Sequence, residues 1–498
     1  MNNQHFDVLI IGAGLSGIDV ACHLAQSCPD KSVALLERRQ AMGGTWDLFR
    51  YPGIRSDSDM FTFGYPFRPW HDPRTLANGT EIRDYIGETA RQFGVDRKIQ
   101  YGVKVLSAQW CSQRQQWRLV AQHEATGETR SYTCRFLVSC TGYYNHDQGF
   151  QPRFPGEDAF KGLRIHPQHW PENLDYAGKR VVVIGSGATA VTLVPAMAEK
   201  AAHITMLQRS PSYVVSMPGV DGISALLKRF LPDSVVYRFA RKRNLALQRG
   251  VYLACRRWPK LMRRVLLSMV RKQVGNDIDM RHFTPNYLPW EQRVCVVPDG
   301  DLFEKLKSGK ASIVTDTIES FTQHGIRLTS GQMLQADIII TATGLSLQML
   351  GGMSVEVDGE PTVLNELMTY KGVLLQNVPN MACLFGHANT PWTLKVDLAA
   401  RYLCRLLQHM DASGQAVVVA RDSAHCALDS SILGVLSSGY IQRGDATLPR
   451  QGGQYPWQVT QHLGKDTDIL LQQPIADQWL QFSAPSETAP STEALACG

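Results

Sequence analysis

The chain has 498 residues, enough for about three domains of ordinary size, and 44% of its residues are apolar against 19% charged. This composition excludes a disordered, collagen-like or coiled-coil chain and predicts a folded, soluble protein. The 51 Lys and Arg residues exceed the 45 Asp and Glu residues too slightly for a nucleic-acid-binding protein, unless the charge is concentrated. The 11 Cys residues form no CxxC or CxxxxC pair, so neither a disulfide framework nor a zinc ribbon is indicated.

The sequence carries no signal for export or for membrane spanning. The residues before the first motif lack the charged and apolar regions of a secretion signal, and no stretch approaches 18 consecutive apolar residues. We therefore expect a cytoplasmic enzyme, in a reducing compartment that suits unpaired cysteines.

A first dinucleotide-binding unit is predicted close to the N-terminus. An apolar strand beginning at Phe6 leads into a glycine turn and a helix, and a second strand ends at Glu37. Gly12, Gly14 and Gly17 complete the pattern GxGxxG. The first glycine permits the tight turn, the second lets the backbone approach a pyrophosphate, and the third lets helix and strand pack. The acid at the end of the second strand can accept hydrogen bonds from ribose hydroxyls.

A second unit of the same kind is predicted after residue 178. Gly185, Gly187 and Ala190 form GxGxxA after a Val/Ile strand. The strand that follows ends in Arg209 and Ser210 instead of an acid, which suits the 2′-phosphate of NADPH. The predicted NADPH contacts are Gly185, Gly187, Thr189, Ala190, Arg209 and Ser210.

The pattern predicts an α/β fold with two Rossmann-like dinucleotide-binding domains and a helical insertion. Two strands end in Thr-Gly, at Thr141-Gly142 and Thr343-Gly344, on either side of the second unit. They suggest that one domain is inserted within the other. The expected division is an FAD domain of residues 1–148 and 375–498, an NADPH domain of 149–215 and 285–374, and a basic helical insertion of 216–284. The Ser/Pro/Ala-rich tail is expected to be disordered from about residue 483.

The positive charge is concentrated in residues 221–275, which contain 14 Lys and Arg residues against 2 Asp and Glu residues. Apolar residues recur there at helical spacing and predict basic amphipathic helices. They form either a helical subdomain with a solvated basic face or a surface for peripheral attachment, to anionic lipid on the inner membrane face or to an acidic partner. A nucleic-acid partner is not expected, because no known binding module accompanies the charge.

One motif between the two units resembles a family fingerprint. Phe160, Gly162, His166, Trp170 and Pro171 fill every position of FxGxxxHxxxW followed by Pro or Asp. This resembles the fingerprint of Baeyer–Villiger monooxygenases, within the class B flavoprotein monooxygenases. Further segments, including GGTWDLFRYPGIRSDSDM and WEQRVCVVPDGDLF, resemble the ethionamide-activating branch, and the resemblance covers almost the whole chain. In this family the fingerprint is an interdomain linker, so His166 is expected to couple domain movements.

The resemblance implies the cofactors and the reaction. FAD in the first unit would take hydride from NADPH in the second and react with O2, giving a peroxyflavin that converts a ketone to an ester or lactone. Oxidation of sulfides or thioamides is a further implied activity, so the implied partners are O2 and a small ketone or sulfide. No metal site is expected, because a Pro separates His166 from His169 and no acidic or Cys ligand is near. The oligomeric state stays open.

The resemblance also implies the active-site residues. Arg293 matches the active-site arginine, and Asp57 matches the carboxylate that pairs with it. A guanidinium that keeps its proton suits a developing anion better than a lysine does. The family's cyclic-ketone branch has Lys directly before this arginine, where the chain has Gln292, so Arg209 is left with more of the NADPH selectivity. The residues expected to contact the flavin are Gly43, Gly44, Thr45, Trp46, Asn389 and Trp392.

Three alternatives were weighed. A flavin-dependent monooxygenase that hydroxylates N or S atoms is the nearest, and Trp170-Pro171 favours the ketone reaction over it. A pyridine-nucleotide disulfide oxidoreductase would need a CxxxxC motif, which is absent. A membrane- or partner-binding flavoprotein without turnover is opposed by the second nucleotide unit and by Arg293.

Overall fold

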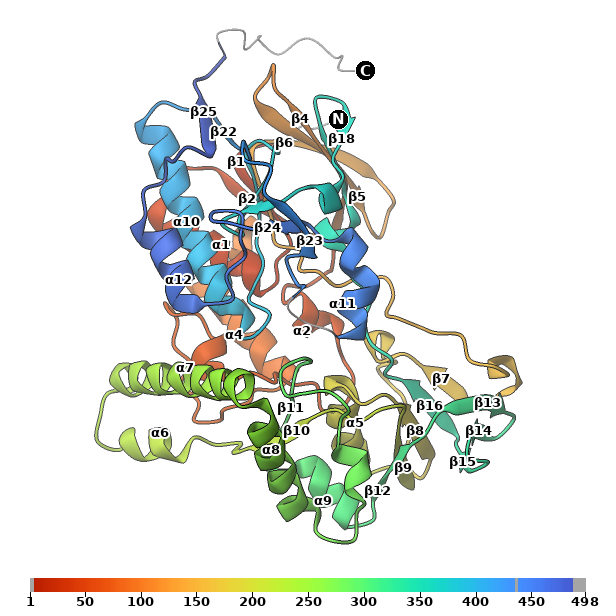
Figure 1. Ribbon diagram of the computed structural model, residues 1–498. Coiled ribbons are helices and arrows are strands. Elements are labelled where there is room, and N and C mark those ends of the chain that lie inside the picture. The colour runs from red at the N-terminus through yellow and green to blue at the C-terminus, as the bar shows by residue number, and fades with distance from the viewer. Residues whose placement is uncertain (1–3, 435–437, 487–498) are drawn as a thin grey trace.

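The computed structural model describes residues 4–434 and 438–486, arranged around two main sheets (Figure 1). The first sheet follows the order β18-β17-β4-β5-β6-β1-β2-β3, and β21 extends it from β6. Its strands are β1 (Gln4–Ile11), β2 (Val33–Glu37), β3 (Ile99–Tyr101), β4 (Val103–Cys111), β5 (Gln116–His123), β6 (Thr129–Ser139), β17 (Ser354–Val357), β18 (Glu360–Pro361), β19 (Thr369–Tyr370), β20 (Leu374–Leu375) and β21 (Met381–Cys383). The core strands β3, β2, β1, β6 and β21 run parallel.

Alternation along β1 explains how both faces of the first sheet are covered. Val8 and Ile10 point into the cluster built with α1 (Leu15–Ser27), α4 (Gly79–Gln92) and α10 (Trp392–Ala412). Leu9 points into a second cluster with Trp110 and Trp117 of the antiparallel strands β4 and β5. Strands buried on both faces are expected to be continuous apolar runs, as β1 and β2 are.

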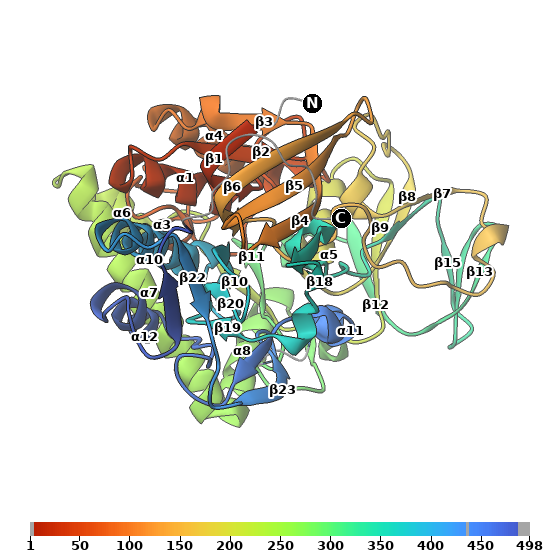
Figure 2. The same cartoon turned by 90° about the horizontal axis from the view of Figure 1, so that it is seen from above.

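The second sheet is fully parallel, in the order β12-β9-β8-β16-β7. Val181 and Val183 of β8 pack with helix α5, while Val182 packs with Phe321 of the small sheet β13-β14-β15. This small sheet projects on the side away from α1 (Figure 2). The elements are β7 (Leu163–Ile165), β8 (Arg180–Ile184), β9 (His203–Gln208), β12 (Ala311–Thr315), β13 (Ile318–Thr322), β14 (Gly325–Leu328), β15 (Met333–Gln335), β16 (Ile338–Thr341), α5 (Ala188–Met197) and α9 (Asp301–Lys307). The parallel core of the first sheet and the fully parallel second sheet confirm the predicted fold class.

The segment expected as a helical insertion contains three helices, α6 (Gly222–Leu227), α7 (Asp233–Arg257) and α8 (Pro259–Val274). They are preceded by β10 (Val214–Met217), which pairs with β11 (Cys295–Pro298) beyond them. None of the helices in the described ranges has the length and apolarity that a membrane span requires.

One predicted domain boundary is wrong. β17 pairs with β4 from Ser354 onward, so the chain returns to the first sheet about twenty residues before the predicted position 375. This return has no recognisable signal in the sequence, because β17 and β18 are short strands at the edge of the sheet. At the start of the predicted tail, β25 (Leu480–Ser483) pairs with β22 (Val417–Ala420), and the amide of Ser486 donates to the side chain of Gln115 at 2.9 Å. The prediction of a disordered tail from about residue 483 falls mainly on residues that the structure does not describe. Residues 487–498 lie outside the described ranges.

Candidate active site

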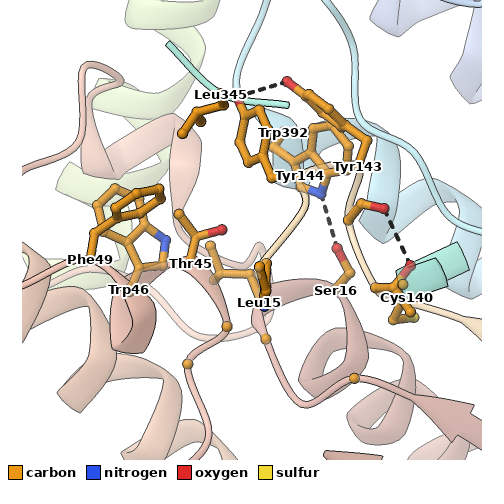
Figure 3. A pocket seen from close by; sticks show the side chains of 18 of the residues that line it. Leu15, Ser16, Thr45, Trp46, Phe49, Cys140, Tyr143, Tyr144, Leu345 and Trp392 are labelled. Atoms are coloured by element: carbon orange, nitrogen blue, oxygen red, sulfur yellow. Dashed lines mark hydrogen bonds between the residues drawn. The ribbon is translucent and has the colours of Figure 1, made fainter. Parts of the chain in front are cut away.

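A cavity of about 370 Å³ lies where the first glycine turn meets residues from the second unit. Figure 3 shows Trp46 and Phe49 on one side of it, and Tyr143, Tyr144 and Trp392 on the other. The predicted residues that line it are Gly12, Gly14, Glu37, Gly43, Gly44, Thr45, Trp46, Asp57, Thr189, Arg293 and Trp392. Those that do not are Gly17, Gly185, Gly187, Ala190, Arg209, Ser210, Asn389 and the five fingerprint residues.

The first glycine turn has the geometry that a dinucleotide requires. Gly12 has φ of +100°, and a Cβ there would lie 2.8 Å from the carbonyl oxygen of Cys140. A Cβ on Gly17 would lie 1.9 Å from the carbonyl oxygen of Gly12, so only glycine lets α1 pack this closely. Gly14 precedes α1 without any side-chain cap, which leaves the first backbone N–H groups of the helix available to a phosphate.

Glu37 has a structural task besides its predicted one. Its carboxylate accepts hydrogen bonds from the backbone N–H groups of Ala13, at 2.7 Å, and Arg39, at 2.8 Å. Burial raises the pKa of Glu37, and these two hydrogen bonds oppose the rise. Glu37 therefore fixes the backbone of the glycine turn through these hydrogen bonds, and it also lines the cavity.

Two buried polar atoms near the cavity have no hydrogen-bond partner among the described residues: Nε of Arg293 and Oδ1 of Asn389. The amide of Asn389 does donate to the carbonyl oxygen of Gln461 at 3.0 Å. A buried donor or acceptor without a hydrogen bond lowers the stability of the folded protein, and a bound group commonly supplies the missing partner. Together with the glycine turn, they show that these residues fit a dinucleotide with a polar ring system.

Arg293 sits among aromatic hydroxyls. Burial alone would lower the pKa of Arg293, but the nearby oxygens of Tyr143, Tyr440 and Tyr144 and the charge of Asp57 outweigh burial and raise it. A guanidinium held in this way stays charged at every working pH. The side chain of Asp57 is exposed, and no ion pair within 4.0 Å joins it to Arg293 in the described structure. The predicted contact between the two is therefore absent in this conformation, although Asp57 still acts on Arg293 through its charge.

The three tyrosines were not predicted from the sequence. Tyr143 and Tyr144 follow the Thr-Gly end of β6; their rings lie 4.4 Å apart and their hydroxyls 3.2 Å apart. Tyr440, on α11 (Gly439–Gly444), is 6.4 Å from the ring of Tyr144. Trp392 completes the wall at 5.1 Å from Tyr143, and its indole N–H donates to the hydroxyl of Ser16 at 2.9 Å. The only sequence signal near them is the strand end at Thr141-Gly142. We interpreted it as a sign of domain insertion and not as a wall of the cavity.

The predicted NADPH end is open to solvent. Arg209 and Ser210 are exposed after β9, and a Cβ on Gly187 would meet nothing within 4 Å. Arg443 of α11 stacks 3.6 Å over the ring of Phe150. Burial lowers the pKa of Arg443, and the positive charge of Arg209 lowers it further. Neither arginine is paired with a carboxylate in the part of the chain that the structure describes. Arg443 is a second cation at this end that the sequence did not reveal, because it lies more than 200 residues from Arg209.

The fingerprint residues lie outside the cavity, and His166 lies beside the two segments that follow the Thr-Gly strand ends. His166 contacts the carbonyl oxygen of Gly344 through Nε2 at 3.2 Å and accepts from the amide of Gln168 through Nδ1 at 3.2 Å. A Cβ on Gly149 would lie 2.0 Å from the ring of His166, so this ring packs tightly between Gly149 and Gly344. Burial lowers its pKa. The remaining members pack nearby: Phe160 against Phe321 at 6.4 Å, Gly162 against the carbonyl oxygen of Asp337, and Trp170 against the core of the second sheet, with Pro171 exposed.

A buried acidic cluster lies behind the first glycine turn. Nε2 of His23 is 3.4 Å from Asp19 on the same helix and 2.9 Å from Asp397 on α10. Burial raises the pKa of Asp19 to about 7. Burial alone would lower the pKa of His23, but the carboxylates of Asp19 and Asp397 outweigh it and raise the pKa to about 9. The ligand atoms of the three residues lie within 4.8 Å of one another, so two carboxylates and an imidazole form a buried cluster between α1 and α10.

This cluster predicts how stability depends on pH. Both folded-state pKa values exceed the unfolded ones, so the folded protein binds more protons and its free energy of unfolding falls as pH rises from about 4 to 9. Asp19→Asn removes the carboxylate whose pKa is raised by burial. We expect the variant to lose less stability than the natural protein between pH 5 and pH 8, by about 2 kcal/mol. Thermal unfolding followed by circular dichroism at both pH values measures this, and equal losses would show that Asp19 does not titrate there.

The family is decided by comparison with known proteins. Residues 6–383 match the family described as flavin-binding monooxygenase-like. The chain belongs to this family. The predicted monooxygenase class is thereby confirmed, together with the prediction that the protein is an enzyme.

Relatives of this flavin monooxygenase span its whole length. The chain is 61% identical over 489 residues to the "Putative FAD-containing monooxygenase MymA" of Mycobacterium tuberculosis, covering 97% of this chain and 99% of that one. It is 49% identical over 483 residues to the FAD-containing monooxygenase EthA of the same species, with 96% and 98% covered. A solved structure, of an oxidized steroid monooxygenase bound to NADP, shares the fold with a TM-score of 0.77 at 22% identity, covering 97% and 100%.

Proposed function

We propose that this flavin monooxygenase holds FAD against the first glycine turn and NADPH at the second, and inserts one oxygen atom of O2 next to a ketone carbonyl to give an ester or lactone. The observation that carries the proposal is the unpartnered, permanently charged Arg293 inside an aromatic cavity that Gly12, Gly14 and Thr45 also line. The domain division that follows assigns FAD to the unit of the first sheet, including β17–β21, and NADPH to the unit of the second sheet.

The chain's own residues position the reactants. FAD, when bound, supplies the hydride-accepting and oxygen-activating chemistry that no side chain of this cavity can perform. Gly12 and Gly14 let the backbone approach a pyrophosphate, and Trp46 and Trp392 form apolar walls that exclude water. Arg293 presents a fixed positive charge to the anion that develops during oxygen transfer, and the site pays no reorganisation cost because the charge is already in place.

The hydroxyls of Tyr144 and Tyr440 keep their protons at neutral pH. Burial raises the pKa of Tyr144 and of Tyr440 well above the usual value. Neutral phenols carry no negative charge that would pair with the guanidinium, so the charge of Arg293 stays free for the substrate side.

Oxidation of sulfides or thioamides is the second candidate. It is favoured by the likeness of residues 43–60 to the ethionamide-activating branch and by 49% identity to EthA. Both reactions would need the same cofactors and cavity, and they differ in the substrate. A ketone carbonyl is the electrophile, so its oxidation would use the fixed charge of Arg293 to stabilise a developing anion, whereas a sulfide sulfur is itself the nucleophile.

The proposal is tested with purified, FAD-loaded protein. NADPH and NADH consumption are followed with a linear methyl ketone and with its sulfide analogue, and products are identified by mass. We expect ester formation coupled to NADPH, with NADH much poorer. Sulfoxide as the only product would favour the second candidate, and NADPH oxidation with peroxide as the sole product would refute both substrate assignments.

A further inference from the structure

The exposed apolar side chains of this protein are gathered in one region. Thirteen of the nineteen strongly exposed large apolar side chains in the described structure lie between Val220 and Met269. Phe230, in the turn between α6 and α7, is 78% exposed and is the most exposed of them all. Scattered apolar residues are normal on a surface, but a concentration of this kind marks a surface that contacts something.

The same region carries the basic charge. Residues 221–275 hold 14 Lys and Arg residues and 2 acidic ones, and both acids are already engaged, Asp221 with Arg243 and Asp233 with Lys228. The uncompensated cations therefore dominate the field over α6, α7 and α8. Figure 1 shows these helices along one side of the molecule, outside both sheets.

The inner and outer faces of α7 differ. Tyr237 and Ala240 are buried in the core of the first unit, and Arg241 donates to the carbonyl oxygen of Phe61 at 2.9 Å. The opposite stripe of the helix carries Lys242 and Arg249, seven residues apart and both exposed. Leu253, one turn further along this stripe, is 50% exposed. The outer face is thus cationic with apolar residues between the charges.

Helix α8 repeats the arrangement. Leu266 and Val270 are buried, Val270 in the core of the second unit, whereas Leu261 is 55% and Met269 42% exposed. Arg264, on the outer side, is exposed as well. Trp258, at the junction of α7 and α8, is 56% exposed, which is unusual for the largest side chain in proteins. Trp, Phe and Leu between Lys and Arg are the composition of a helix that lies in a membrane interface.

This surface is connected to the active site. Asn244 of α7 donates to the carboxylate of Asp59 at 2.9 Å, two residues from Asp57. The ring of Tyr252 packs edge-on against Trp290 at 5.5 Å, three residues before Arg293. The helices that carry the basic apolar surface therefore support both segments that bring Asp57 and Arg293 to the cavity.

We infer that the outer surface of α6–α8 docks the enzyme onto an anionic lipid bilayer, with Phe230 and Trp258 in the headgroup region and Lys and Arg over the phosphates. A second copy of the chain is a poorer occupant, because two surfaces of the same strong positive charge repel each other. An acidic protein would satisfy the charge but leaves the exposed Phe, Trp and Leu side chains without an explanation. Docking would bring the cavity loops close to apolar substrates dissolved in the membrane.

The test uses the full-length, FAD-loaded protein and vesicles of phosphatidylcholine with or without phosphatidylglycerol. We expect the protein to sediment with the anionic vesicles at low salt, to be released by high salt, and to ignore the neutral ones. Phe230→Ser and the double variant Lys242→Glu with Arg249→Glu should each lower the partition constant at least about tenfold. The matched controls Val363→Ser and Arg327→Glu, both exposed and outside this surface, should bind as the natural protein does.

Flavin content and thermal unfolding establish that each variant is folded, and turnover of a short water-soluble ketone should be unchanged in all of them. Equal binding by the natural protein and the surface variants, or no binding to anionic vesicles, would overturn the inference. Concentration-dependent dimers abolished by the same variants would overturn it in favour of self-association. The binding measurement does not depend on the proposed reaction, so either proposal can fail alone.

Discussion

Replacing Arg293 by alanine is expected to lower product formation at least about 100-fold while FAD remains bound. The variant removes the fixed cation of Arg293, on which Tyr143, Tyr144 and Tyr440 act, so a developing anion loses that stabilisation. The proposed FAD contacts are the glycine turn and Thr45, which the substitution does not change. Product yield per NADPH consumed, measured with flavin content by absorbance, checks both parts.

The control for this prediction is Arg293→Lys. It keeps a positive charge but loses the planar fork, so an intermediate yield is expected, with more peroxide released per NADPH. Full product yield in the alanine variant would remove Arg293 from the catalytic role. Loss of FAD in both variants would show instead that the arginine holds the cofactor.

Replacing Arg209 by alanine is expected to raise KM for NADPH at least about tenfold and to leave KM for NADH unchanged. A charge-assisted hydrogen bond to the 2′-phosphate contributes about 1.5–3 kcal/mol, and NADH has no such phosphate. With Gln292 in place of a lysine, Arg209 has few cationic neighbours that could compensate. Steady-state kinetics with both nucleotides measure the effect.

Arg443 offers a second, independent check of the same site. Arg209 is close enough to Arg443 for its charge to contribute to lowering the pKa of Arg443. Arg443→Ala should therefore also raise KM for NADPH, by a smaller factor. Arg327→Ala, an exposed arginine on β14 of the same unit, serves as the control and should change nothing. Equal increases for NADPH and NADH in Arg209→Ala would mean that the residue does not recognise the phosphate.

The fold could be predicted largely because its signals are local. Gly12, Gly14 and Gly17 are required by backbone contacts within the first βαβ unit, and the structure shows the close approaches that the pattern demands. Parallel strands buried on both faces are continuous apolar runs that the sequence displays directly. The return of the chain at Ser354 could not be predicted, because edge pairing between β17 and β4 depends on tertiary contacts over more than 240 residues.

The candidate site was predictable only in part, because several of its residues come together only through tertiary contacts. Arg293 was found through the resemblance of its segment, and it does line the cavity beside the glycine turn. Tyr143 is near a recognisable strand end, but nothing local indicates that its ring would face Trp392. Tyr440 and Arg443 lie on a short helix without a motif, and the separation of Asp57 from Arg293 depends on conformation, which no spacing encodes.

Isotopic labelling of the product tests the central claim most directly. The enzyme is supplied with ¹⁸O₂, NADPH and a linear methyl ketone, and the ester is analysed by mass spectrometry before and after hydrolysis. The balance is ketone, O2, NADPH and a proton giving ester, water and NADP⁺. We predict one labelled oxygen per ester, found in the alcohol after hydrolysis, because oxygen inserts between the carbonyl carbon and its neighbour. No ester, or an ester without label, would contradict a Baeyer–Villiger oxygenation.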